Sequence, residues 1–152
     1  MSFNTRQYSS RSSDSAPTSD HKAWAQKNIV LKSSDPNFRT DIFSDVAEEA
    51  ANRCFHKQFN KPAQVRMFYD ELVRWQSKVA DSQSKFEELL PYIRMMRAKL
   101  AYAKGRQLIN DAFYDIFSTC IDKVCDIESL KHCKLFSKHI WASVKLLATN
   151  FV

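Results

Sequence analysis

The sequence has one glycine and four prolines among its 152 residues. β-Sandwiches and β-barrels need turn residues about every eight to twelve positions, so this scarcity argues against them and favours helices. No apolar run approaches the roughly 18 residues that a membrane span requires. The N-terminal segment also lacks the apolar core of a signal peptide. We therefore expect an all-α protein that resides in the cytoplasm and has no membrane partner.

Sequence signatures of catalysis and of metal binding are missing as well. There is no GxSxG elbow, P-loop or HExxH motif. Glu87 and Glu88 are adjacent, so they point to different sides of a helix and do not form an acid–base pair. The cysteines lack CxxC spacing and are expected to be reduced thiols: Cys54, Cys120, Cys125 and Cys133. We expect no enzymatic activity, no cofactor and no metal.

What the chain does contain is an apolar core and an excess of positive charge. Hydrophobic residues make up 44% and aromatic residues 12%, too much for a disordered chain, and the length corresponds to one domain. The formal net charge is +6. A basic excess of this size favours a phosphate-bearing partner or an acidic protein surface, without naming which.

The chain divides into three parts by composition. Residues 1–22 are rich in serine and are expected to form a disordered tail. Residues 23–40 are expected to form an irregular arm with at most one short helical turn. Residues 41–152 are expected to form a compact bundle of about five helices, because apolar residues recur there at three- and four-residue intervals. The predicted helices cover about 41–59, 63–80, Ser82 or Ser84 to Gly105, 107–125 and 128–149.

The third of these segments carries the clearest functional signal. Proline suits a first helical turn and glycine ends a helix in the left-handed conformation, so Pro91 and Gly105 are expected to mark the two ends of a basic helix. The segment before Pro91 is either continuous with it through a kink or a separate piece. From Pro91 onward this segment has five cations and no acid: Arg94, Arg97, Lys99, Lys104 and Arg106.

A solvated helix face usually mixes both signs of charge, so a one-signed helix is a candidate polyanion site. Ile93, Met96, Leu100 and Ala103 share the face expected to be buried. Ala98 and Ala101 lie between the cations, where small side chains would let a sugar–phosphate chain approach. Tyr102 is expected to pack. A plain solvated basic face remains the competing interpretation.

Further cations occur near the junction of the first two predicted helices, at Arg53, Lys61 and Arg66. Such clusters usually contact phosphates and position a nucleic acid without reading its sequence. Trp75 and Trp141 fall beside the apolar stripes of their helices, so they are candidates for protein–protein contacts, where tryptophan is enriched.

Three stretches resemble the small subunit of type III-A CRISPR effector complexes, the Csm family. The first is Gln64-Val-Arg-Met-Phe-Tyr-Asp-Glu71. The second, Leu90 to Arg106, is similar to the family's AKxAYxxGR-type core. The third is Leu130 to Ala148, which resembles the C-terminal helix of the family. Where the family helix has an F-E-A motif, this sequence has Lys138-His-Ile-Trp-Ala-Ser-Val144.

The resemblance implies an all-α subunit without catalytic activity that acts in antiviral defence. Copies would stack along the backbone subunits of the complex, beside its large subunit, and line the channel that holds guide RNA paired to target RNA. The residues that match the family motifs and would contact the RNA backbone are Arg66, Arg97, Lys99 and Arg106. Lys104 and Arg94 join them on helix geometry alone.

Two other classes of function stay open at this point. One is a helical structural or regulatory module that docks on an acidic protein, binds no nucleic acid and oligomerises through Trp75 or Trp141. The other is a helix-turn-helix DNA binder. The latter is disfavoured because the basic residues precede the turn at Gly105, whereas a recognition helix would follow it.

Overall fold

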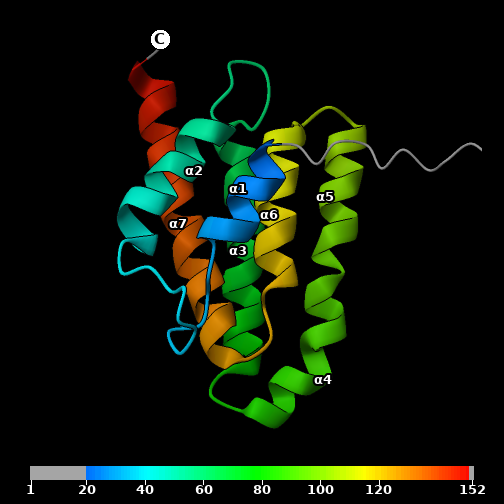
Figure 1. Cartoon of the computed structure of the whole chain (residues 1–152). Helices are drawn as coiled ribbons and strands as arrows, with labels where there is room; N and C mark the ends of the chain where they lie inside the picture. The colour runs from blue at the N-terminus through cyan, green and yellow to red at the C-terminus, as the bar shows by residue number, and fades with distance from the viewer. Residues whose placement is uncertain (1–19, 151–152) are drawn as a thin grey trace, which may run out of the picture.

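The computed structural model describes residues 20–150 and shows an all-α bundle, as predicted (Figure 1). The described part of the chain contains no strand. It also contains no helix long and apolar enough to cross a membrane. The elements are α1 (Asp20–Asn28), a π-helical segment η1 (Ile42–Val46) that continues into α2 (Ala47–Cys54), α3 (Pro62–Val79), α4 (Gln83–Arg94), α5 (Met96–Gly105), α6 (Asp111–Asp122) and α7 (Ile127–Asn150).

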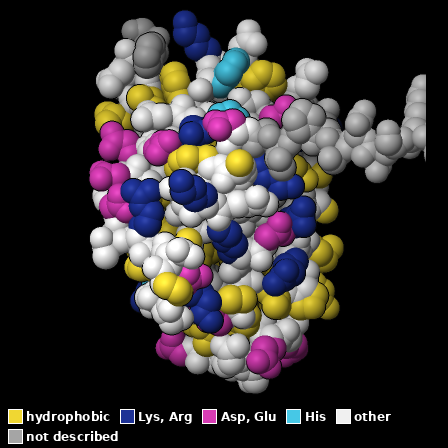
Figure 2. All heavy atoms as spheres, viewed as in Figure 1, with side chains coloured by type: hydrophobic (Ala, Val, Ile, Leu, Met, Phe, Trp, Pro, Cys, Tyr) yellow, Lys and Arg dark blue, Asp and Glu magenta, His cyan; other side chains and the backbone are white. Residues whose placement is uncertain are grey.

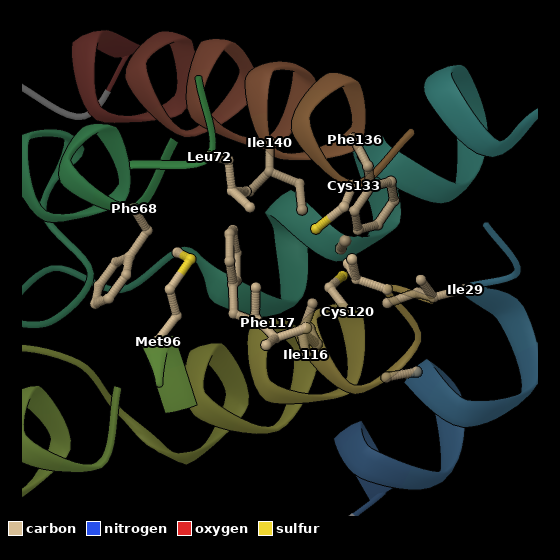
Figure 3. Packing of buried hydrophobic residues seen from close by; sticks show 14 of the residues in the cluster. Ile29, Phe68, Leu72, Met96, Ile116, Phe117, Cys120, Cys133, Phe136 and Ile140 are labelled. Carbon is tan, nitrogen blue, oxygen red and sulfur yellow. The ribbon is translucent and has the colours of Figure 1, made fainter. Parts of the chain in front are cut away.

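Helix α6 organises the core. It packs against α1 on one side and α5 on the other, while α3 and α7 lie side by side and α2 crosses α7. Phe113 and Phe117 of α6 stack with their ring centroids 4.2 Å apart, and Phe68 of α3 tilts against both. Figure 3 shows side chains from several helices meeting in this region, including Cys120 and Cys133. Burial of these large apolar groups is the main force that holds the helices together.

Several helix ends follow the signals in the sequence. Pro62 begins α3, where its missing N–H has no helical partner to lose. The Ser82 side chain accepts a hydrogen bond from the Lys85 N–H and caps α4. The Asn110 side chain caps α6 in the same way, accepting from the Phe113 N–H.

Two expectations about the basic helix are wrong. Pro91 does not open it: α4 begins at Gln83 and contains Pro91, and the chain breaks at Met95. Two separate pieces is one of the two alternatives that the sequence left open. The break at Met95 comes after Pro91, however, whereas a proline removes a hydrogen bond and crowds the helical turn that precedes it. Gly105 does not have a positive φ either. The left-handed residue after α5 is Gln107, with a φ of 60°.

The expectation of an irregular arm over 23–40 is wrong for its first part. Residues Asp20–Asn28 form α1, and only the chain after it is irregular. Ala25, Ile29 and Leu31 are buried in the main core, so this segment is part of the bundle. Of the predicted disordered tail, residues 1–19 lie outside the described residues, whereas residues 20–22 belong to α1, so the prediction is wrong for these three.

Contacts from distant parts of the chain hold α1 in place. The Lys123 ammonium donates hydrogen bonds to the carbonyls of Gln26 and Ile29 at the end of the helix. The Arg53 guanidinium lies 4.8 Å from the centroid of the Trp24 ring. A cation at a helix C-terminus satisfies carbonyls that have no partner within the helix. Local sequence pattern carries no signal for either contact.

Candidate nucleic-acid interface

Helix α5 presents a narrow outer ridge of small residues. Met96, Leu100 and Ala103 face the core, as predicted, and are almost fully buried. Ala98, Ala101 and Gly105 are exposed on the opposite side. A Cβ added to Gly105 would meet no atom within 4 Å. The backbone of this helix is therefore open to close approach by another molecule.

Two predicted cations lie on the flank of α5 that faces α6. The Arg97 guanidinium is 3.1 Å from the Asp122 carboxylate, and the Lys104 ammonium is 2.8 Å from the Asp111 carboxylate. The hydrogen bond that the Lys104 ammonium donates to the Asp111 carboxylate raises the pKa of Lys104. Both side chains stay about half exposed. Both side chains therefore reach solvent.

The other flank of α5 faces α3. Here the Lys99 ammonium lies 2.7 Å from Glu71, whose side chain is only 10% exposed. The Arg106 guanidinium donates to the Tyr102 hydroxyl at 2.9 Å. Tyr102 itself is 65% exposed, so the expectation that it packs is wrong. Its ring and Arg106 extend the ridge toward solvent.

The surface around α5 therefore carries both signs of charge, although the sequence of α5 itself contains only cations. The acids that pair with it come from α3 and α6, so a scan along α5 does not find them. Exposed ion pairs contribute only about 0–1 kcal/mol, and such cations can exchange a carboxylate for a phosphate. Two α5-region cations have no acidic partner among the described residues: Arg94 donates to the Val124 carbonyl, and Arg106 contacts Tyr102.

The three cations of the predicted helix junction, Arg53, Lys61 and Arg66, have different surroundings in the structure. Lys61 precedes α3, and the neighbouring Asn60 N–H donates to the Leu108 carbonyl at 3.1 Å, which joins this loop to the loop after Arg106. Figure 1 shows both loops at the same end of the bundle. The Lys61 ammonium donates to the Lys57 carbonyl, and the residue lines a cavity with Val144 and Ala148 of α7, so its part in an α5 surface stays a prediction.

Arg53 has a different environment. It pairs with Asp20 at 3.0 Å and Glu49 at 3.2 Å, covers the Trp24 ring, and its side chain is only 21% exposed. These contacts join α1 to α2. Its role in RNA binding stays a prediction that this geometry does not favour.

Arg66 is separated from the α5 cations and lies beside a tryptophan that the sequence suggested only as a protein contact. Its guanidinium is 5.5 Å from the centroid of the Trp141 ring, and it is 3.6 Å from Asp70. Trp75 donates to Glu71 at 3.4 Å and lies under the Lys78 ammonium. Both tryptophans are partly buried, so neither is a freely exposed anchor.

Sequence reasoning missed an apolar groove between α3 and α5. Its volume is about 640 Å³, and the Lys99–Glu71 ion pair lies along it. Met67, Met95 and Leu108 line it and are 60%, 59% and 41% exposed. Contiguous exposed apolar side chains mark interaction sites. The available signal was the position of two methionines outside the apolar stripes.

The described residues hold no group of three or more potential metal-ligating side chains. Cys54, Cys120 and Cys133 are buried free thiols, and Cys125 is exposed. Burial raises the pKa of Cys54 far above its usual value. A thiol with a raised pKa is a poor nucleophile, so these buried groups act as small apolar side chains.

Figure 2 shows basic, acidic and apolar side chains interspersed on one face of the molecule. Together with the fold, these features define a small all-α protein with a basic helix on its surface. The family model described as Csm2 Type III-A matches residues 39–146, which is most of the chain. The chain belongs to this family, the small subunits of the type III-A Csm complex, and the predicted resemblance is confirmed. Comparison with curated proteins gave no match, and comparison with solved structures gave none either.

Proposed function

We propose that this protein is a non-catalytic subunit of the type III-A CRISPR ribonucleoprotein that binds the backbone of the guide–target RNA duplex through α5. The observation that carries the proposal is the exposed ridge of Ala98, Ala101 and Gly105 with cations on both flanks. Small residues let the helix backbone approach a sugar–phosphate chain, and the flanking cations reach its phosphates. Contacts of this kind do not depend on base sequence.

The α5 surface would be completed by residues at the end of the bundle. Lys61 and Arg106 lie on loops that a backbone hydrogen bond joins, and Arg106 has no acidic partner among the described residues. Each free subunit would bind RNA weakly. Several copies held along the backbone subunits, beside the large subunit, would bind much more tightly, because linked sites raise the effective concentration. Neighbouring copies and these subunits are therefore the protein partners that we propose.

The test is a salt titration of the free protein with a duplex RNA. We expect binding that is independent of RNA sequence and falls steeply with salt. The double variant Arg97→Ala, Arg106→Ala should lower the magnitude of the salt slope by about two, one for each lost phosphate contact. The matched control is Lys27→Ala with Lys85→Ala, two exposed lysines with no ion pair among the described residues. Equal losses in both double variants would refute the α5 site.

A second candidate function is a module that docks on an acidic protein without binding nucleic acid. The apolar groove between α3 and α5 favours it, because exposed methionines are typical of protein interfaces. In that case the α5 variants would lose assembly with the other Csm subunits and no duplex RNA binding would be measured at low salt. Normal assembly together with weakened RNA retention excludes this alternative.

A further inference from the structure

Helix α7 carries a stripe of lysines that the α5 proposal does not use. The stripe consists of Lys131, Lys134, Lys138 and Lys145, with Trp141 between the last two. These five residues are spaced by three, four, three and four positions, which places them on one side of an α-helix. At about 1.5 Å per residue the α7 lysine stripe is about 21 Å long. Lys134 is partly exposed and the other three lysines are exposed.

The α7 lysine stripe is more one-signed than α5. No Asp or Glu occurs on α7 after Glu128. Within residues 20–150, none of the four lysines forms an ion pair, whereas Arg97, Lys99 and Lys104 of α5 each do. Like charges three and four positions apart destabilise a helix slightly. The stripe therefore opposes folding slightly, and a bound polyanion would remove that repulsion.

An aromatic pair lies along the stripe. The Trp141 ring is nearly parallel to the Tyr69 ring of α3, with an interplanar angle of 6° and centroids 6.1 Å apart. Two cations lie over Trp141: the Arg66 guanidinium and the Lys145 ammonium, each 5.5 Å from the ring centroid. The Asp70 carboxylate lies 3.6 Å from Arg66. Both rings are partly exposed.

We propose that the α7 lysine stripe and the Trp141–Tyr69 pair bind single-stranded RNA. The lysines contact successive phosphates, and an unpaired base stacks on the exposed part of the aromatic pair in place of one of the two cations. Proteins that bind single strands combine a basic track with aromatic rings in this way. A base inside a duplex is already stacked between its neighbours, and an acidic peptide has no base to stack. The choice of RNA over DNA rests on the proposed function.

This surface is separate from the α5 surface. In Figure 1, α5 and α7 lie on opposite sides of the molecule, with α3 and α6 between them. A subunit with both surfaces would bind the duplex on one face and an unpaired stretch of RNA on another. Arg66, which motif resemblance assigned to duplex backbone contact, would belong to the single-stranded site.

The experiment measures binding of the full chain to a 12-nucleotide uridine RNA and to an RNA duplex across a salt series. Lys138→Gln with Lys145→Gln should reduce the magnitude of the single-strand salt slope by about 1.4, since each lost phosphate contact contributes about 0.7. Trp141→Ala should weaken uridine RNA binding about five- to tenfold and leave duplex binding unchanged, whereas Trp141→Phe should keep most of the affinity. The control pair is Lys27→Gln with Lys85→Gln.

The outcomes separate this inference from the proposed function. Loss of single-strand binding only in the α7 variants supports the inference, even if no variant changes duplex binding. If the α7 lysine pair and the control pair weaken single-strand binding equally, the inference is wrong. It is also wrong if polyglutamate binds the protein and this binding depends on Lys138 and Lys145 to the same extent. If circular dichroism shows that Trp141→Ala does not fold, the test uses Lys138→Gln with Lys145→Gln, whose side chains are exposed, together with Trp141→Phe.

Discussion

Replacing Gly105 with alanine should stabilise the protein while weakening its binding to duplex RNA. Gly105 is the last residue of α5 and does not have a positive φ. Within a helix, alanine is favoured over glycine by about 0.8–1.0 kcal/mol. The added Cβ would meet no atom within 4 Å, so no steric cost offsets this gain.

The expected size of the effect follows from the position of Gly105. Because the residue ends the helix, we expect about half of the interior value, or about 0.5 kcal/mol, in the free energy of unfolding. For a chain of this length that corresponds to a rise in Tm of about 1–2 °C. Urea denaturation with circular dichroism measures the difference directly. Ala101→Gly, in the middle of the same helix and also exposed, is the matched control and should lose about 1 kcal/mol.

The functional half of this prediction uses the same proteins. If the sugar–phosphate chain approaches the ridge of α5, the methyl group added at position 105 occupies space that the RNA needs, and duplex affinity falls despite higher stability. A Gly105→Ala variant that is clearly less stable than wild type would refute the structural reasoning. A variant that is more stable and binds duplex RNA normally would refute close approach at this residue.

Three other predictions concern the fold itself. Lys123→Met removes two hydrogen bonds to the end of α1 and should cost about 1–2 kcal/mol in urea unfolding, with α1 the first segment to lose hydrogen-exchange protection. Phe117→Ala empties the space against Phe113, 4.2 Å away, and should cost about 3–5 kcal/mol, measured as a lower urea midpoint. Hydrogen bonds from Ser33 hold the pKa of Glu128 below its usual value. The ionised carboxylate therefore adds to the free energy of unfolding at any pH above the usual pKa of a glutamate. This contribution is lost as the pH falls through the lowered pKa of Glu128 in the folded protein. Glu128→Gln should therefore be less stable than wild type at pH 7 and equal to it at strongly acidic pH in parallel denaturation curves.

Helices whose signals are local were predicted to within a few residues. The stripe expected over 63–80 is α3 (Pro62–Val79), and the one expected over 128–149 is α7 (Ile127–Asn150). The signals that predict these helices are local. They are the apolar periodicity of α3 and α7, Pro62 at the start of α3 and the Ser82 cap of α4, and each acts within one or two turns of helix. The break lies at Met95, four residues after Pro91, whereas a proline disturbs the helical turn before it, so the proline in the sequence did not locate the break.

The candidate site was harder to predict than the helices. The cations of α5 could be identified from the sequence, but their partners could not, because Glu71, Asp111 and Asp122 reach α5 only through packing. In the same way, no local pattern indicates that the Arg66 guanidinium lies 5.5 Å from the centroid of the Trp141 ring, because the two residues are 75 positions apart in the sequence. Side-chain pairs on different helices depend on how those helices cross.

The sequence by itself determined that the chain is helical, which faces are apolar, and that α5 and its motif resemble the Csm small subunits. These properties follow from composition and from spacing along single helices, so they need no knowledge of the fold. Tertiary structure alone decided that α1 is a helix, since Lys123 and Arg53 hold it from other elements. It also decided which basic surface is free of acids: the cations of α5 are largely paired by neighbouring helices, and the lysines of α7 are not. Net charge is a property of the sequence, but the potential at a surface depends on which charges packing brings together.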